Sequence, residues 1–206
     1  YLQLLQNLVD KSWLNTEFSG MQREFTMHAI VRDYGSQKLI NMGIETKYNT
    51  HQRHCDYYLH FVSLLEAGMS SARMHQLINS IRQELANVQS AWRWAVLQGQ
   101  YELISRSCIA LCDFYIHAGL FREGALELEL AVETLQALLS NEEDLSIQEW
   151  GPAISLALSA HAMLLHRQGE IEQSIHQCER AIQLAEKSGS LRVIGISTQC
   201  YVAAKL

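Results

Sequence analysis

The stretch REFTMHAIVRDYG, residues 23–35, changes from the period of a β-strand to that of a helix at His28. Before the histidine, Phe25 and Met27 alternate with polar residues, which is typical of a strand with one apolar face. After it, one helical face carries Ile30/Val31, Tyr34 and Lys38/Leu39. The sequence therefore predicts that a strand ends, and a helix begins, at His28.

The residues upstream complete a recognisable order of elements. Residues 1–9, YLQLLQNLV, place leucines at helical spacing, and residues 13–27 have the pattern of a β-hairpin that turns at Ser19-Gly20. Helix, hairpin, helix is the second half of a winged-helix domain, so residues 1–45 are predicted to be its C-terminal half. The chain begins and ends inside apolar patterns, and we take it for a piece of a longer polypeptide.

The rest of the chain is predicted to be helical. One proline in 206 residues, with 48% hydrophobic residues, favours a mostly helical protein with a sizeable core. Residues 46–100 are predicted to form a helical connector, in which 74–98 read as one helical run that ends at Gly99. Residues 101–118 are apolar on two faces, which indicates a helix packed between neighbours.

An internal repeat predicts the architecture of residues 101–206. The segment AGLFREGALELELAVETLQ from Ala118 aligns with QGEIEQSIHQCERAIQLAE from Gln168, so that Gly119 matches Gly169 and Ala131 matches Ala181. Glycine in a turn and alanine at a close contact suit stacked helical hairpins. We predict tetratricopeptide-like repeats, with the acidic residues 140–150 as an inserted loop; an irregular helical bundle is the alternative. The predicted fold class is therefore mainly α, with one short β-hairpin.

Composition narrows the class of function. The net charge is −6, and residues 1–60 are balanced, so the chain is a poor electrostatic match for nucleic acid. Five irregularly spaced cysteines indicate buried thiols in a reducing, cytoplasmic setting, not a disulfide framework. No apolar run reaches the roughly 18 residues of a membrane span. A phosphate-binding loop of the form G-x-x-x-x-G-K-[ST] is missing from the sequence, and we expect this chain not to be an enzyme.

At this point the sequence resembles a family. LLQNLVDKSWL followed by REFTMHAIVRDYGSQKL resembles the winged-helix segment of STAND-class, NB-ARC-like signalling ATPases. HQRHCDYYLHFV, ELANVQSAWRWAVLQGQYE and FYIHAGLFREGALELEL are similar to the connector and first repeats of bacterial members. The resemblance covers essentially the whole chain. It implies a parent protein in which a nucleotide-binding domain precedes the winged helix and helical repeats act as the sensor.

The resemblance also implies a mechanism and its partners. ADP held between the nucleotide-binding and winged-helix domains keeps such proteins closed, and a protein or small-molecule ligand on the repeats releases them for ATP-dependent assembly into oligomers. The Met-His-Asp motif of the family falls on Met27, His28 and Ala29, so His28 would contact the β-phosphate of ADP. Because Ala29 replaces the aspartate, that residue's role is absent here. We expect no cofactor in this segment alone, and ADP or ATP in the parent.

Physical chemistry leaves two interpretations of His28. The N-terminus of a helix has unpaired N–H groups and a partial positive charge, so a histidine there can help to bind an anion. The histidine can equally do no more than cap the corner between strand and helix. The family resemblance favours the phosphate contact.

Other candidate sites have plainer explanations. His51, His54 and Cys55 could present metal ligands on one helical face, as could Cys108 with Cys112, but we favour thiols of the core and predict no metal site. Of Trp92 and Trp94, one is predicted to be core and the other nearer the surface, with ligand stacking as the alternative to packing.

Two other functions remain open. The chain could be an interaction scaffold without a nucleotide role, or a winged-helix DNA-binding regulator. The helix before the hairpin offers DNA little beyond Lys11, which disfavours DNA binding because phosphate contacts and base readout use Arg and Lys.

Overall fold

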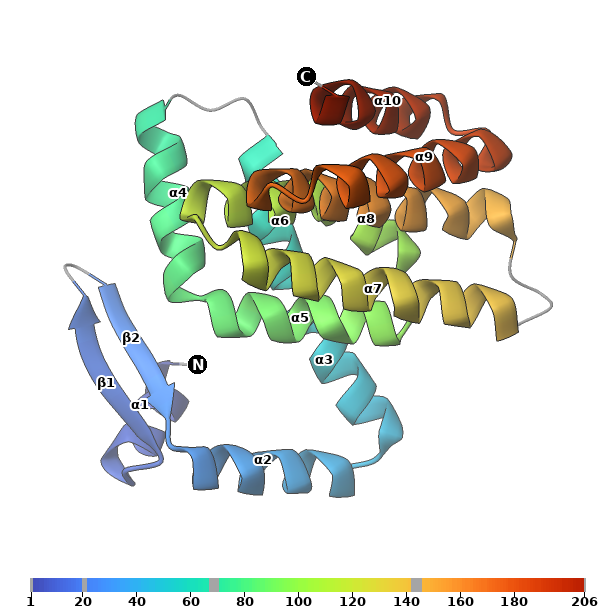
Figure 1. Ribbon diagram of the computed structural model, residues 1–206. Helices are drawn as coiled ribbons and strands as arrows, with labels where there is room; N and C mark the ends of the chain where they lie inside the picture. Colours follow the sequence, from blue (N-terminus) through green and yellow to red (C-terminus); the bar gives the residue numbers. More distant parts are fainter. Residues whose placement is uncertain (1, 20–21, 67–70, 142–145, 206) are drawn as a thin grey trace. The chain divides into compact units, whose positions relative to one another are not determined.

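A computed structural model describes residues 2–19, 22–66, 71–141 and 146–205 (Figure 1). The chain divides into two compact units, Tyr1–Gln52 and Arg53–Leu206. The division lies inside a helix, α3 (Ile44–Ser63). The segment expected as a separate connector therefore belongs mostly to the same compact unit as the repeats.

The first unit has the predicted order of elements. Helix α1 (Leu2–Asp10) precedes an antiparallel hairpin of β1 (Leu14–Ser19) and β2 (Gln22–Met27), in which Leu14 lies opposite Met27. Helix α2 (Ala29–Asn41) follows directly. The predicted change from strand to helix at His28 is confirmed. No described residue after Met27 lies in a strand, as expected. The predicted turn residue Gly20 lies outside the described residues.

One face of α2 packs within the first unit. The ring of Tyr34 meets Trp13 edge-on, with 5.6 Å between the ring centroids, and Val31 and Leu39 are half-buried. Leu14, at 7% exposure, is the buried hydrophobic residue among the described residues of this unit. Since a single buried leucine is a small core for about fifty residues, this unit exposes most of its apolar side chains.

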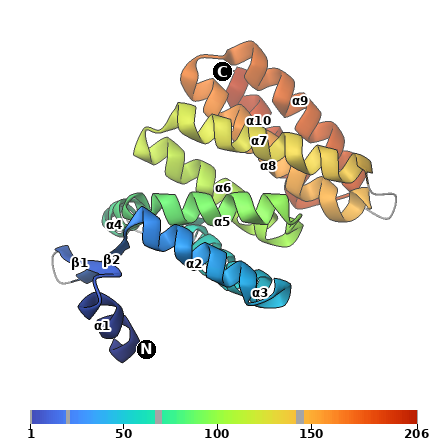
Figure 2. The same ribbon diagram turned by 90° about the horizontal axis from the view of Figure 1, so that it is seen from below.

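The second unit is a stack of helices. It begins within α3 and continues through a short 3₁₀ helix η1 (Leu64–Glu66) into the following α-helices (Figures 1 and 2): α4 (Ser71–Gln83), α5 (Leu85–Leu97), α6 (Tyr101–Ala118), α7 (Phe121–Asn141), α8 (Ile147–Gln168), α9 (Ile171–Ser188) and α10 (Leu191–Lys205). Helix α8 lies at its centre and packs against α6, α7, α9 and α10. The prediction of a mainly α protein with one short hairpin and helical repeats is confirmed.

Glycines end the helices of the repeats as predicted. Gly119 and Gly169 follow α6 and α8 with φ of +72° and +86°, the left-handed conformation in which glycine has no steric penalty. Each sits in a turn so short that α7 and α9 begin two residues later. Gly189 repeats this arrangement between α9 and α10, with φ of +72°.

The two aligned alanines lie at close contacts. Ala131 is 1% exposed and Ala181 is 0% exposed. The carbonyl of Ala181 accepts a hydrogen bond of 2.7 Å from Ser155 Oγ of α8. Ser155 and Ser159 also bond to Ser197 Oγ of α10, at 3.2 and 2.9 Å. Small side chains let α8, α9 and α10 approach closely, and these hydroxyls satisfy the buried polar groups between them.

Two sequence interpretations were wrong in detail. Residues 74–98 are not one helix, because α4 and α5 meet at Glu84, whose backbone leaves helical geometry at φ −96° and ψ 12°. The carboxylate of Glu84 accepts hydrogen bonds from Tyr58 Oη at 3.1 Å and from Asn87 Nδ2 at 2.7 Å, which stabilises the corner. The acidic residues 140–150 are not one loop either, since α7 runs to Asn141 and Ser146 caps the start of α8; residues 142–145 lie outside the described parts.

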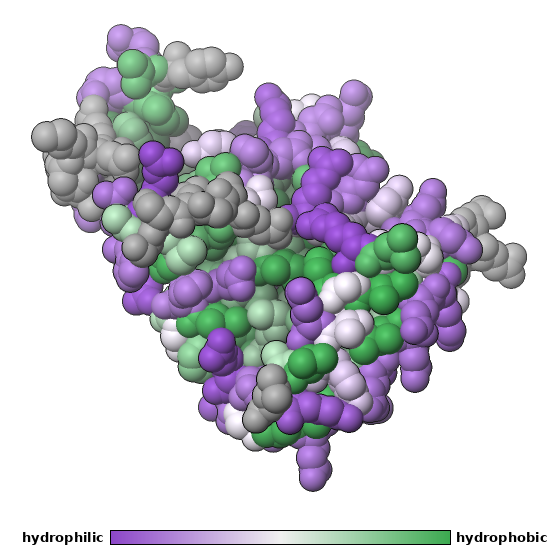
Figure 3. All heavy atoms as spheres, turned by 90° about the horizontal axis from the view of Figure 1, so that it is seen from above, coloured by the Kyte–Doolittle hydropathy of each residue, from purple (hydrophilic) through white to green (hydrophobic). Residues whose placement is uncertain are grey.

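The surface of the repeats mixes both kinds of residue. Figure 3 shows hydrophobic groups lying among hydrophilic ones, and the last helix, α10, exposes Leu191 at 84% and Val202 at 51%. None of the described helices has the length and apolar character needed to cross a membrane.

Candidate functional site

His28 occupies the corner that the sequence singled out. It is the N-cap residue of α2, with extended backbone angles of φ −60° and ψ 143°. Its Nδ1 accepts a hydrogen bond from the backbone N–H of Ile30 at 3.4 Å. The side chain thus satisfies one of the N–H groups that have no partner inside the helix.

This cap determines which ring nitrogen can face a ligand. An Nδ1 that accepts a hydrogen bond carries no proton in the neutral ring, so the proton lies on Nε2. His28 is exposed, and its ring therefore presents an Nε2–H donor to the surroundings of the corner. Capping and ligand contact use opposite nitrogens and can operate together.

Arg32 adds positive charge at the same corner. Its guanidinium Nη2 donates to the carbonyl of Met27 at 3.4 Å, so the side chain turns back toward the end of β2. Its backbone N–H donates to the carbonyl of His28 at 3.0 Å. Residues 29–32 include no acidic side chain. A helix N-terminus, an imidazole N–H and a guanidinium therefore lie together, which is a set of groups suited to an anion.

Arg32 was missed by the sequence interpretation. The signal was present, because Arg32 follows His28 by four residues and i, i+4 side chains share a helical face. Ala29, at the motif's third position, contributes no side-chain donor or acceptor.

Helix α1, the predicted recognition helix, ends at Asp10 and so excludes Lys11. Helix α1 contains no lysine or arginine, and its Leu2 and Leu4 are 81% and 63% exposed. Such a surface suits contact with an apolar protein surface better than contact with phosphates.

The cysteines belong to the core, as predicted. Among the described residues, all five thiols are buried and none is in a disulfide. Cys55 donates to the carbonyl of Ala91 at 3.4 Å, and burial raises the pKa of its thiol to about 12. His54 contacts the ring of Tyr58, with 4.7 Å between centroids. The described residues include no cluster of three or more His, Cys, Asp or Glu side chains placed to hold a metal ion.

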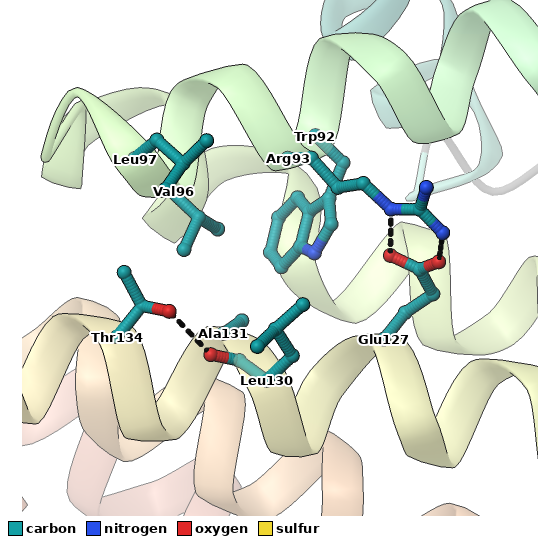
Figure 4. A pocket seen from close by; sticks show the side chains of 8 residues that line it. All are labelled: Trp92, Arg93, Val96, Leu97, Glu127, Leu130, Ala131 and Thr134. Carbon is teal, nitrogen blue, oxygen red and sulfur yellow. Dashed lines mark hydrogen bonds and ion pairs between the residues drawn. The ribbon is translucent and has the colours of Figure 1, made fainter.

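The two tryptophans differ as predicted. Trp92 is 1% exposed and lies in the core of the second unit, whereas Trp94 is half-buried and packs at its edge. Trp92 also lines a pocket between α5 and α7 (Figure 4), which no sequence pattern had indicated.

An ion pair lies beside this pocket. Arg93 Nε donates to Glu127 Oε2 at 3.0 Å, and Arg93 Nη2 donates to the other carboxylate oxygen (Figure 4). Glu127 is buried, and this two-point contact neutralises its charge. The hydrogen bonds to Glu127 raise the pKa of Arg93 above its ordinary value.

Comparison of the chain with protein-family models, with curated proteins and with solved structures finds no match. The functional assignment therefore depends on the geometry of the two units and on the sequence resemblance.

Proposed function

We propose that this chain is a non-catalytic regulatory and sensor segment of a cytoplasmic STAND-type signal-transduction ATPase. In this proposal the winged-helix unit is the lid that responds to the state of the nucleotide. The helical repeats bind a small-molecule or protein ligand. ATPase activity, if the parent has it, belongs to an upstream nucleotide-binding domain, because this chain has no phosphate-binding loop.

The proposal depends mainly on one observation: the two ring nitrogens of His28 have different roles, because Nδ1 caps the helix and Nε2 does not. Nδ1 is held by the N–H of Ile30, which orients the ring and leaves Nε2–H as a donor at the N-terminus of α2. A β-phosphate of ADP is the anion that the family resemblance assigns to this position. Arg32 supplies a cationic group that compensates its charge in this proposal.

The exposed apolar side chains of the first unit support a partner domain. Within Tyr1–Gln52, the exposed hydrophobic residues include Leu2, Leu4, Ile30, Ile40, Met42 and Ile44. Hydrophobic exposure on this scale, where Leu14 is the buried hydrophobic residue among the side chains that the structure describes in this unit, marks a surface for association. The upstream nucleotide-binding domain is the partner that the proposal assigns to it.

The second candidate is an interaction scaffold in which His28 is only a helix cap. It is favoured by the same bond from Ile30, since a capping histidine needs no ligand to explain its position. The two candidates differ in the role of Nε2. In the lid model Nε2–H binds the nucleotide, whereas in the scaffold it has no role.

Two substitutions in the full-length parent separate these candidates. His28→Asn keeps a side-chain acceptor of the kind that caps helices well, but its shorter amide does not reach where Nε2 lies. His28→Ala loses both functions. His176→Ala, at an exposed position on α9, is the matched control.

The readouts are the ADP bound to purified protein and the signalling output without ligand. The lid model expects both His28 variants to carry less ADP and to signal without ligand, and the control to behave as wild type. A His28→Asn variant with wild-type ADP content and output would instead support the scaffold.

A further inference from the structure

The pocket between α5 and α7 has the features of a small-molecule site. Its volume is about 120 Å³. Apart from the ion pair, it is lined by Trp92, Val96, Leu97, Leu130, Ala131 and Thr134 (Figure 4). Leu97 and Leu130 are both more than half exposed, so the pocket lies at the surface of the second unit.

One polar atom in this lining has no partner. Trp92 Nε1 is buried, and it makes no hydrogen bond to any described part of the chain. Figure 4 shows the indole nitrogen turned toward α7, on the side of Leu130 and Glu127, which also line the pocket. An unpaired buried donor destabilises a fold, and native structures contain few of them. A bound acceptor would remove this penalty.

The other polar groups of the lining already have partners. Thr134 Oγ1 donates to the carbonyl of Leu130 at 2.8 Å. Arg93 and Glu127 bond to each other and cancel in charge. A charged ligand would therefore meet an apolar lining and an ion pair whose charges already cancel, and it would lose its hydration without a counter-charge. The lining favours a neutral ligand with one acceptor.

The volume restricts the size of such a ligand. An apolar cavity of about 150 Å³ holds one benzene molecule. A pocket of about 120 Å³ is of similar size, so a five-membered ring with a single substituent, which has the six heavy atoms of benzene, is the largest ligand expected to fit. Leu97 and Leu130, being exposed, can change rotamer to admit it.

We propose that the pocket between α5 and α7 binds a small neutral molecule made of a compact apolar ring and one carbonyl oxygen, which accepts a hydrogen bond from Trp92 Nε1. This inference locates the ligand-binding site of the helical repeats and states which kind of ligand it binds. The proposed function is needed only to say what role the bound ligand plays; the binding itself is argued from the pocket. The site lies within Arg53–Leu206, and its test requires no nucleotide.

Cyclopentanone and methylenecyclopentane are the matched probes, because they share shape and size but only the ketone has an acceptor. Each is titrated into the ¹⁵N-labelled 206-residue chain, and the indole N–H signals of its four tryptophans are followed. The Trp92 signal is assigned as the one that Trp92→Phe removes. We expect cyclopentanone to shift this signal saturably and to bind about fivefold or more tightly than the hydrocarbon, as for one neutral hydrogen bond.

Two variants test whether the preference comes from the indole N–H. Trp92→Phe keeps an aromatic ring without the donor, and it should bind both probes within about twofold of each other. Trp94→Phe, the control two residues away, should keep the preference for the ketone. If Trp92→Phe does not fold, the Trp92 signal is assigned as the one that remains when Trp13, Trp94 and Trp150 are each replaced by Phe in turn, and the comparison of the two probes on the wild-type chain decides the matter.

The proposal is overturned by a Trp92 signal that responds to neither probe, which would assign the N–H to buried water or to a protein partner. It is equally overturned by equal affinity for the two probes, or by parallel shifts of all four indole signals. None of these outcomes bears on His28, so the proposed function is tested separately.

Discussion

Replacing Ala181 with leucine tests the stacked-repeat architecture at a fully buried contact between α8 and α9. Ala181 is 0% exposed, and its carbonyl accepts a 2.7 Å hydrogen bond from Ser155 of α8. Leucine adds three carbons, whose burial would stabilise the fold by roughly 2.4 kcal/mol if space existed. Because α8 and α9 are already in contact here, the helices must separate instead, and the expected net loss is about 1–3 kcal/mol.

Thermal unfolding followed by circular dichroism measures this loss. For a unit of this size, about 1–3 kcal/mol corresponds to a fall in Tm of roughly 2–12 °C. Ala86→Leu, the same substitution at an exposed position on α5, is the matched control and should leave Tm nearly unchanged. An unchanged Tm for Ala181→Leu, or an equal fall for both variants, would refute the close-packed contact between α8 and α9.

Three further predictions concern buried or strained groups. At pH 8 the five buried cysteines should react with Ellman's reagent only at the rate of unfolding. Burial excludes the reagent, and it raises the pKa of the Cys55 thiol to about 12. Rapid labelling of the native chain would contradict this. Burial, with Arg180 adding to it and Glu129 opposing it, lowers the pKa of His161 below its ordinary value of about 6.5. The unfolded chain then binds a proton that the folded chain does not, so the free energy of unfolding should fall as pH drops below about 6.5. Urea denaturation of His161→Gln should show a weaker dependence of this free energy on pH. Gly99→Ala should lower Tm more than Gly119→Ala, because both have positive φ but only at Gly99 would a Cβ collide with a neighbouring side chain, Trp150.

The sequence predicted the elements whose signals are local. The change of period at His28 located the end of β2 and the start of α2 within one residue. Gly119 and Gly169 marked two helix ends, because a left-handed residue after a helix is most easily glycine. Both kinds of signal depend only on neighbouring residues.

The features that the sequence did not predict depend on packing between distant segments. Nothing in the residues around Glu84 interrupts the helical pattern, and its corner is stabilised by Tyr58, 26 residues away. The pocket at Trp92 needs α5 and α7 to be placed against each other, and the pairing of Arg93 with Glu127 spans 34 residues. Such contacts have no fixed spacing, so a single sequence does not reveal them.

At His28 the sequence predicted the position but not the use of the ring. The helix N-terminus was expected from the pattern, whereas the bond between Nδ1 and the N–H of Ile30 follows from the backbone angles at the corner. That bond sharpens the hypothesis, because it assigns the cap to one nitrogen and leaves the other for the phosphate.

The most direct test of the proposed function is the rate at which ADP leaves the full-length parent in its His28→Asn form. A hydrogen bond to a charged group contributes about 1.5–3 kcal/mol, so its loss should accelerate release about ten- to hundredfold. The release can be followed with a fluorescent ADP analogue chased by excess ADP, with His176→Ala as the control. We expect release about ten- to hundredfold faster from His28→Asn, with an unchanged rate for the control. A wild-type release rate from His28→Asn would contradict the phosphate contact and leave His28 as a helix cap.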